Sequence, residues 1–589
     1  MEINNLKNYA VKYFTELNHS LHKQYLTLRM FFVGGYTAEQ VAAEFGYSVN
    51  TVYSMVRDFK GKLAESVGDP FFKDMKLGRK KLDQGGEIKE LIVAYRKKYL
   101  SVPEIKALMD VQGIKVSERY ITNVLTEDGF ARLPRRDNQT RASSLSEPVG
   151  FLNAPKSSAM VFKSEKFFSQ LAGILLFLPI LRYYGIDEVI KNSDYPESGT
   201  INRMSSILSF LALKLSKMER YSLDDAWCMD RGMGMFAGLN VLPKTAWFSS
   251  YSSGVTRDMN LSFLRGLHEI WIREKLLSDT VNLDFTAIPY WGDDDPFENN
   301  WSGKRGKALS SIQAVLAQDP DSGLLVYTDT TVRHRNEANV IMEFLDFYRA
   351  GDEGYSDLKY LVFDSKFTTY QNLSRLNQQG VKFVTIQRRS KNLSIKAASI
   401  PASSWKDIRV MKANGKGRTV TVYEDMSTLK DYEGNVRQVF IAGRGKVKPA
   451  ILITNDFSIS LKDLIRKYSR RWLIEKDISE QIHFFHLNRN SSGIVVKVDF
   501  DLVMTLLAHN LYRLFASNIN GYSHCDANTI FHKFIMNAAD VSISKSRITV
   551  SLKKKRTLPL TLERFADFAS ISYPWISDKK MIFAASNST

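Results

Sequence analysis

Residues 460–481 read SLKDLIRKYSRRWLIEKDISEQ, and the rest of the chain can be interpreted as support for this stretch. Ser460, with Asp463 three residues later, resembles a capping box, in which side chains satisfy the free amides of a helix start. Apolar residues then recur at helical spacing, at Leu461, Leu464, Ile465 and Trp472. The stretch therefore predicts a single helix from Ser460 to Gln481.

Three functional side chains follow one another at helical spacing within this stretch. Tyr468, Arg471 and Glu475 are separated by three and four positions, which places them on one face of a helix. An ordinary surface ion pair between Arg471 and Glu475 is the simpler interpretation. A catalytic role for Glu475 requires further carboxylates from elsewhere in the chain.

Two strand-borne aspartates meet that requirement. Asp284 lies in the alternating, β-prone segment Thr280–Ile288, and Asp364 ends the apolar strand Lys359–Asp364. A carboxylate within an apolar strand is costly to bury unless a partner compensates it, and Mg²⁺ prefers oxygen ligands. A lone Asp at a strand end is usually a turn or a cap. Three acids in this order instead predict a metal site of Asp284, Asp364 and Glu475.

The segments around these acids predict an α/β core. Strands are expected at Thr280–Ile288, Ser310–Ala317, Gly323–Thr330, Lys359–Asp364 and Lys382–Gln387, with helices at Asn336–Tyr348 and Thr368–Gln379. The order β, β, β, α, β, α, β is that of an RNase H-like fold. Three earlier helices, at Phe167–Tyr184, Ile201–Lys217 and Met259–Leu277, and a later one at Asp499–Ala516 should pack around this core.

A basic, strand-rich segment separates Asp364 from Glu475. Strands are expected at Arg418–Tyr423, Val436–Ala442 and Ala450–Thr454, which predicts a β-rich insertion in the core. The aromatic residues Trp405, Tyr423 and Tyr432 in this segment could stack on an unpaired base, although packing within the protein is the simpler role for each.

The N-terminal region predicts a helix-turn-helix unit. Thr37 and Gln40 form a capping box before a helix over Ala38–Phe45; Gly46 ends this helix, and Ser48 can cap the next, from Val49 to about Phe59. The outward positions of that second helix carry residues suited to base edges and phosphates: Asn50, Thr51, Tyr53 and Arg57. A plain helical hairpin is the alternative.

A second unit of the same kind follows. Ser101 and Glu104 open a helix to about Gln112, and Ser117 caps another that ends near Gly129, with Arg119, Tyr120 and Asn123 exposed. Between the units, Arg79, Lys80 and Lys81 form a short basic linker that suits a minor groove, or merely a solvated loop.

Composition agrees with a nucleic-acid partner. The 589 residues include 81 Lys and Arg against 63 Asp and Glu, a formal net charge of +18. The two cysteines exclude a disulfide framework and fit a reducing compartment. Neither a signal sequence nor an apolar run long enough to cross a membrane is found. We therefore expect a cytoplasmic protein with no membrane association.

With these motifs in place, the chain resembles a bacterial insertion-sequence transposase of the DDE class. The specific resemblance is to the cut-and-paste group with a β-rich insertion and a Y-x2-R-x3-E helix. Asp284-Phe285-Thr286 resembles the first acidic motif, Phe363-Asp364 the second, and Tyr468, Arg471 and Glu475 the helix motif. One departure is Ile482, where the family motif often has a Lys that contacts phosphate.

The resemblance implies a metal-dependent DNA transposase. Asp284, Asp364 and Glu475 would hold two Mg²⁺ ions, or Mn²⁺, for strand cleavage and strand transfer, while Tyr468 and Arg471 would contact the DNA end. The partners would be double-stranded DNA of the transposon ends and of the target, with a homodimer in the active complex on the bacterial nucleoid. Two alternatives remain open: a nuclease of the same fold without strand transfer, and an inactive, transposase-derived DNA-binding regulator.

The predicted organisation is multidomain, with an all-α N-terminal region before the α/β core. The first helix-turn-helix domain is expected at residues 1–70, the basic linker at 71–86, the second domain at 87–136 and another linker at 137–165. A helical region at 166–279 leads into the core, whose two parts, 280–379 and 460–520, flank the insertion at 380–459. Residues 521–589 form a C-terminal region.

Overall fold

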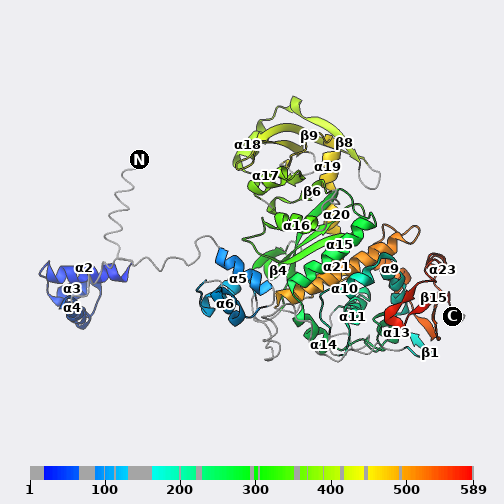
Figure 1. The fold of residues 1–589 in the computed structure, drawn as a ribbon. Coiled ribbons are helices and arrows are strands. Elements are labelled where there is room, and N and C mark those ends of the chain that lie inside the picture. The colour runs from blue at the N-terminus through cyan, green and yellow to red at the C-terminus, as the bar shows by residue number, and fades with distance from the viewer. Residues whose placement is uncertain are drawn as a thin grey trace. The chain divides into compact units, whose positions relative to one another are not determined.

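The computed structural model divides into two compact units, Met1–Gly86 and Glu87–Thr589. It describes residues 19–64, 87–97, 100–111, 114–130, 162–197, 200–219, 228–291, 297–302, 306–350, 358–367, 369–388, 390–411, 417–442, 449–489 and 494–586. In Figure 1 the first unit is dark blue, and the second runs from lighter blue to red.

The first unit contains three described helices, α2 (Ser20–Phe32), α3 (Ala38–Phe45) and α4 (Val49–Ala64). The predicted capping box at Thr37 and Gln40 is present, and Gly46 ends α3 with φ +63°, a conformation that glycine adopts without strain. Val41 and Val52 are fully buried between the helices. Both predicted helices are confirmed, and α2 is an additional helix that contributes Leu28 to the same core.

A second helical group opens the larger unit. It consists of α5 (Glu87–Lys97), α6 (Val102–Val111) and α7 (Glu118–Glu127), with Ser117 capping α7 as predicted. Ile92, Ile105 and Ile121 are fully buried where these helices meet. The helix α5, which the sequence analysis did not predict, completes this core just as α2 completes the first.

A ten-stranded mixed sheet forms the centre of the larger unit, in the order β3-β4-β2-β6-β7-β11-β10-β9-β8, with β5 also paired to β4. The bounds of the first strands are β2 (Thr280–Pro289), β3 (Asn299–Ser302), β4 (Lys307–Gln318), β5 (Leu325–Val332), β6 (Tyr360–Phe363) and β7 (Lys382–Ile386). The strands β2, β6 and β7 run parallel, while β4 is antiparallel to both β2 and β5.

The predicted element order of the core is confirmed. After β5 comes α16 (Val340–Arg349), and α17 (Tyr370–Gln378) connects β6 to β7. The short strand β3, which pairs with β4, was not predicted. Because β2 is central and β6 lies beside it, the chain segments that carry Asp284 and Asp364 are neighbours in the sheet.

The strands of the predicted insertion extend this same sheet. They are β8 (Lys406–Met411), β9 (Gly417–Thr428), β10 (Asn435–Ala442) and β11 (Ala450–Thr454), and β11 pairs antiparallel with β7. A second hydrophobic core lies here, where Val384 and Val439 of the sheet pack with Leu464 and Tyr468. Figure 1 shows β8, β9 and α18 (Lys391–Ser399) on the far side of β6 from β4.

The expected helix from Ser460 to Gln481 is interrupted. The structure has α19 (Leu461–Ser469) and α20 (Trp472–His483), separated by Arg470 and Arg471. At this junction the amides of Arg471, Leu473 and Ile474 bond to carbonyls three residues earlier, which tightens the helix locally.

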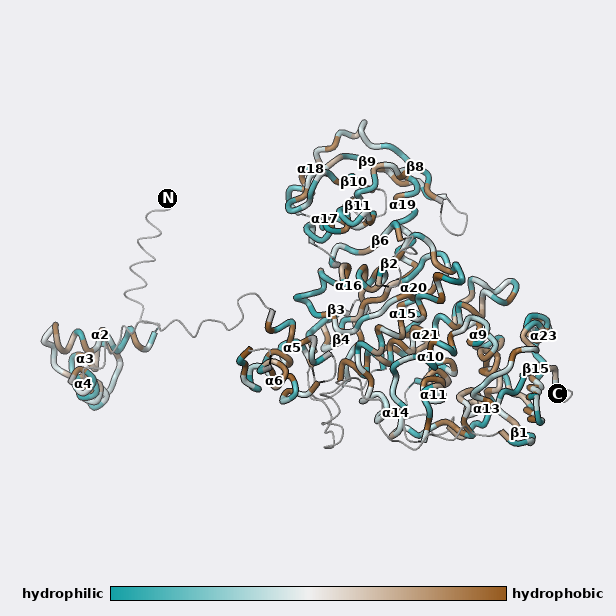
Figure 2. The backbone as a smooth tube through the Cα atoms, in the orientation of Figure 1, coloured by the Kyte–Doolittle hydropathy of each residue, from teal (hydrophilic) through white to brown (hydrophobic). Residues whose placement is uncertain are grey.

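Helices cover the sheet, and α21 (Val495–Ser517) packs on β5 and on α11. The other α-helices among the described residues are α9 (Phe177–Tyr184), α10 (Ile186–Asn192), α11 (Arg203–Leu215), α13 (Arg231–Phe236), α14 (Thr245–Tyr251), α15 (Arg257–Arg273), α22 (Ala527–Ile530) and α23 (Leu558–Ala566). The apolar colour gathers in the helices around α11 (Figure 2). Within the described ranges, no helix is both long and apolar enough to cross a membrane.

The helix expected over Phe167–Tyr184 is shorter in the structure, where α9 begins only at Phe177. Residues Glu165–Ser169 form the strand β1, a 3₁₀ turn follows at Ala172–Leu176, and only then does α9 begin. The strand β1 pairs with β12 (Ala539–Ile543), which local sequence pattern could not reveal. These two strands belong to a five-stranded sheet with β13 (Arg547–Leu552), β14 (Ser572–Tyr573) and β15 (Lys579–Ala585).

Candidate active site

Asp284 lies near the middle of β2, opposite Leu316 of β4. Its side chain is 17% exposed, because the strand is central and its flanks are buried. The backbone amide of Phe285 donates to Asp284 Oδ1 at 2.9 Å. The carboxylate is thus held at the edge of the core with limited access to water.

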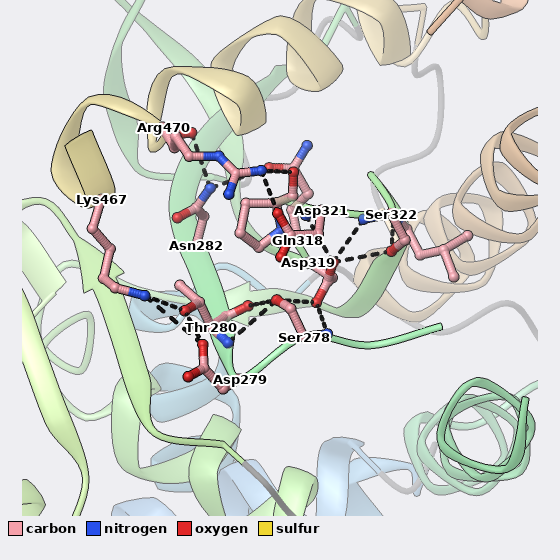
Figure 3. Close-up of polar contacts among 12 residues, drawn as sticks. Ser278, Asp279, Thr280, Asn282, Gln318, Asp319, Asp321, Ser322, Lys467 and Arg470 are labelled. Carbon is pink, nitrogen blue, oxygen red and sulfur yellow. Dashed lines mark hydrogen bonds and ion pairs between the residues drawn. The ribbon is translucent and has the colours of Figure 1, made fainter. Parts of the chain in front are cut away.

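Two basic side chains fix the end of α19 against this part of the sheet (Figure 3). Lys467 Nζ donates to Thr280 Oγ1 at 2.7 Å and lies 3.8 Å from Asp279, both at the start of β2. Arg470 Nη2 pairs with Asp321 at 2.6 Å and donates to the carbonyl of Pro320 at 2.7 Å. These contacts place the junction of α19 and α20 beside β2.

A side chain of the sheet bonds to the backbone at the interruption between α19 and α20. Asn282, which is fully buried and lies two residues before Asp284, donates its side-chain amide to the carbonyl of Arg470 at 3.1 Å and to Gln318 Oε1 at 3.3 Å. The Arg470 carbonyl, which also accepts from the Leu473 amide at 2.9 Å, thus has a second partner from the sheet. Residues two apart on a strand share one face, so this bond also registers α20 against the face that carries Asp284.

Arg471 lies between two of the three predicted acids. Its Nη1 donates to Asp284 Oδ2 at 2.6 Å, and its Nη2 donates to Glu475 Oε1 at 2.5 Å. The arginine side chain is 15% exposed and Glu475 is 43% exposed. The structure therefore contains the Arg471–Glu475 ion pair of the simpler interpretation, and it also joins that pair to the strand-borne acid.

Asp364 follows β6 and accepts a hydrogen bond from the amide of Ser365. Its negative charge is close enough to act on both Asp284 and Tyr468. The third acid thus belongs to the same electrostatic neighbourhood as the other two.

Burial raises the pKa of the Asp284 carboxyl to about 6, since a charged form is costly in a poorly hydrated place. The Arg471 guanidinium and the Phe285 amide oppose this rise, whereas Glu475 and Asp364 add to it. Burial likewise raises the pKa of Tyr468 to about 12. Burial works against the charge of Arg471, yet Asp284 foremost, with Tyr468 and Glu475, leaves its pKa raised.

The donor chemistry of this cluster fits a divalent ion. All three side chains offer the carboxylate oxygens that Mg²⁺ prefers, and two of them, Asp284 and Glu475, already stabilise a cationic group between them. In the described part of the chain, however, no three His, Cys, Asp or Glu side chains are gathered as around a metal ion. The expectation that the three acids lie close enough to share metal is thus not met in this arrangement, in which Arg471 fills the space between Asp284 and Glu475.

A hollow of about 490 Å³ lies beyond the ends of β6 and β7, next to Asp364 in sequence. Its lining includes Ser365, Thr385, Arg388 and Lys430, and the Arg388 Nε donates to the carbonyl of Ser365. Neither these residues nor Asn282 and Lys467 were predicted from the sequence. Only Asn282 carried a local signal, because it shares a strand face with Asp284.

The remaining predicted site residues are spread over other elements. Asn50, Thr51, Tyr53 and Arg57 are exposed on α4, and Arg119 and Asn123 are exposed on α7, where Tyr120 is partly buried. Arg79, Lys80 and Lys81 fall outside the described residues.

Two predicted DNA contacts are involved in packing within the protein. The Tyr468 ring belongs to the second core and is 6% exposed, with the Arg471 guanidinium 5.7 Å from the ring centroid. Trp405 is half-buried before β8, and its ring centroid lies 6.1 Å from that of Tyr423.

Comparison with known proteins identifies the segment that carries the site. Residues 281–511 match the family model described as Transposase DDE domain, which confirms the resemblance to DDE transposases. No curated protein matches the chain. Among solved structures, a cryo-EM structure of a piggyBac transposase synaptic complex with hairpin DNA matches at 11% identity and a TM-score of 0.30, over 60% of this chain and 82% of that one.

Proposed function

We propose that this protein is a DNA transposase that binds the terminal inverted repeats of its element and catalyses metal-dependent strand cleavage and strand transfer. The observation that carries the proposal is the convergence of Asp284, Arg471 and Glu475, with Asp364 beside them, inside the matched segment. The element order and the mixed pairing of β5, β4, β2, β6 and β7 support an RNase H-like core. An origin in a bacterial insertion sequence, with action on the nucleoid, is part of the same proposal.

The three acids would hold the metal. Asp284, Asp364 and Glu475 supply oxygen ligands for two Mg²⁺ ions, for which Mn²⁺ could substitute. When bound, such a pair of ions supplies an activated water or 3′-hydroxyl and stabilises the leaving oxygen. The chain contributes the position of these ligands, through β2, β6 and the clamped helix junction.

The helical groups would recognise DNA. The exposed Asn50, Thr51, Tyr53 and Arg57 of α4 suit a groove, as in a helix-turn-helix unit. Arg119, Tyr120 and Asn123 of α7 would act similarly, and the basic residues Arg79, Lys80 and Lys81 would follow the backbone between the units. Two copies of the chain, one for each transposon end, would form the active complex.

An end-cleavage assay tests the proposal. The full-length protein is incubated with end-labelled DNA of the element's terminal repeat, with Mg²⁺ or with chelator, and the products are resolved on a denaturing gel. Metal-dependent nicks at the repeat and joining of the 3′-hydroxyl to a target plasmid are expected, and Asp364→Asn should remove both. Cleavage without joining would indicate a nuclease, and binding that Mg²⁺ does not alter would indicate a non-catalytic regulator.

A further inference from the structure

We propose that Arg471 is an internal cation that competes with divalent metal for Asp284 and Glu475, so that metal binding displaces the guanidinium and makes it available to a DNA phosphate. This inference rests on the proposed function, because it takes the acids as metal ligands. It goes further by assigning Arg471 two alternative partners. Arg471 is thus a positioning residue whose partner depends on whether metal is bound.

The Arg471 guanidinium lies between the two acids, where a bound metal ion would place its positive charge. Separate nitrogens, Nη1 and Nη2, reach Asp284 and Glu475 at 2.6 and 2.5 Å. The fork therefore joins acids from two elements that are distant in the chain, β2 and α20.

Competition follows from the atoms involved. Arg471 occupies Asp284 Oδ2 and Glu475 Oε1. Because the other Asp284 oxygen, Oδ1, accepts from the Phe285 amide, a divalent ion on these acids would need the oxygens that Arg471 occupies. A guanidinium that stays beside the ion would place two cations together in a poorly hydrated site, which is unfavourable. Metal and Arg471 should therefore exclude each other from these oxygens.

The surroundings allow the side chain to move while the backbone stays in place. Asn282, Lys467 and Arg470 hold the helix junction to the sheet through bonds that do not involve the Arg471 side chain. Within the described residues, the buried Arg471 Nε has no hydrogen-bond partner, so one donor of the guanidinium remains unsatisfied in this position. A phosphate offers oxygens to a guanidinium in a geometry that suits its planar fork.

The test measures metal affinity without DNA and without activity. Mn²⁺ binding to the full-length chain is followed by electron paramagnetic resonance for the wild type, Arg471→Ala, Arg471→Gln and Lys476→Ala. Lys476 is the matched control, because it is exposed next to Glu475 and its loss changes the net charge equally. We expect Mn²⁺ to bind roughly tenfold more tightly to both Arg471 variants, within the usual range of coupling between two ligands, and the control to change little.

Two results for the Arg471 variants would overturn the inference. Unchanged Mn²⁺ affinity in folded Arg471 variants would show that the arginine does not compete with metal, and weaker Mn²⁺ binding would show that it instead holds the acids in a metal-binding arrangement. Circular dichroism establishes that each variant is folded, and Arg471→Gln keeps most of the side-chain volume if Arg471→Ala does not fold. Absence of Mn²⁺ binding in the wild type and in both Arg471 variants would overturn the proposed function along with this inference. If only the inference fails, the wild type binds Mn²⁺ and Asp364→Asn weakens that binding.

Discussion

At the scale of single residues, the site is defined by one carboxylate, Asp284, that the protein keeps in an unfavourable environment. Asp284 is mostly buried on a central strand, and burial raises its pKa to about 6 even though Arg471 lies 2.6 Å away. Above that pH the folded state holds a charge that the unfolded chain would hydrate better. Such an arrangement costs stability and is typical of functional sites.

Replacing this carboxylate with its neutral amide should separate catalysis from folding. Asp284→Asn should abolish cleavage while DNA binding is retained, because the change removes a metal ligand and no DNA contact. The folded pKa is above the unfolded value, so the wild-type carboxyl destabilises the fold increasingly as the pH rises from about 4 to about 6. The variant should therefore be more stable than the wild type at pH 7.5, by up to ~3 kcal/mol, and by roughly half as much at pH 5.0.

Urea unfolding at the two pH values measures this difference, and a gel-shift assay measures DNA binding. A variant that is less stable than the wild type at pH 7.5 would contradict the prediction. In that case the Asp284–Arg471 contact would contribute more to the fold than burial of the carboxylate costs.

At the scale of elements, the side-chain amide of Asn282 on β2 helps to position α20. Asn282 donates a hydrogen bond to the carbonyl of Arg470 at the helix junction. The side chains of Lys467 and Arg470 bond to the start of β2 and to the turn that follows β4 (Figure 3). These contacts set where Arg471 and Glu475 lie relative to Asp284.

Removal of that amide should therefore affect both stability and catalysis. Asn282→Ala removes the side-chain donor to the Arg470 carbonyl, which keeps only the Leu473 amide, and should cost about 0.5–1.5 kcal/mol of unfolding free energy. Cleavage should fall more steeply than DNA binding, because the helix that carries Glu475 loses its registration. Urea unfolding and the end-cleavage gel measure the two effects, and full cleavage by a destabilised variant would show that α20 is positioned without Asn282.

A buried ionic network joins the helices to the sheet on the other side of the core. Asp499 of α21 is fully buried and accepts from Arg257 at 2.8 Å, from Asn260 at 2.7 Å and from the Thr330 hydroxyl at 3.0 Å. These contacts connect α21 with α15 and β5. The network is structural, since it lies among helices that cover the sheet.

Its disruption should be costly. Asp499→Ala leaves the buried Arg257 without its closest carboxylate and should destabilise the protein by about 3–5 kcal/mol. Glu188→Ala is the control, because Glu188 is 48% exposed and its ion pairs with Arg182 and Lys191 should contribute about 1 kcal/mol or less. Chemical denaturation measures both, and equal effects of the two substitutions would contradict the prediction.

At the scale of the whole molecule, the chain consists of two units that have separate cores. The first unit, Met1–Gly86, has its own buried residues around Val41 and Val52, whereas the second helical group belongs to the larger unit. In that larger unit, Arg335 pairs with Asp128 at the end of α7, and Arg333 lies 5.7 Å from the ring centroid of Phe130. The α5–α7 group is thus attached to the segment that follows β5.

Truncation at this boundary should separate end recognition from catalysis. A fragment of residues 87–589 should unfold cooperatively and bind Mn²⁺ like the full chain, because its core is complete. Its affinity for end DNA should be lower, and the slope of affinity against salt concentration should be shallower, since the phosphate contacts of the first unit are lost. Fluorescence anisotropy over a salt series measures this, and unchanged affinity and slope would remove the first unit from end recognition.

The sequence by itself determined the local features of this protein. Capping residues and apolar spacing predicted α3, α4, α6 and α7, and alternation predicted β2, because these patterns act over a few neighbouring residues. The strand position of Asp284 and the helical spacing of Arg471 and Glu475 followed in the same way.

Only the tertiary structure decided which distant segments meet. Pairing with β12 makes β1 a strand where a helix was expected to begin. At the interruption of the other expected helix, the Asn282 side chain donates to the carbonyl of Arg470, which lies 188 positions away in the chain. Likewise, Arg471 could be assigned by spacing to Glu475, but its second bond, to Asp284, depends on how α20 lies against β2. The physical reason is that such partners are selected by burial and by the need to satisfy backbone groups in the folded core, which no local pattern of residues records.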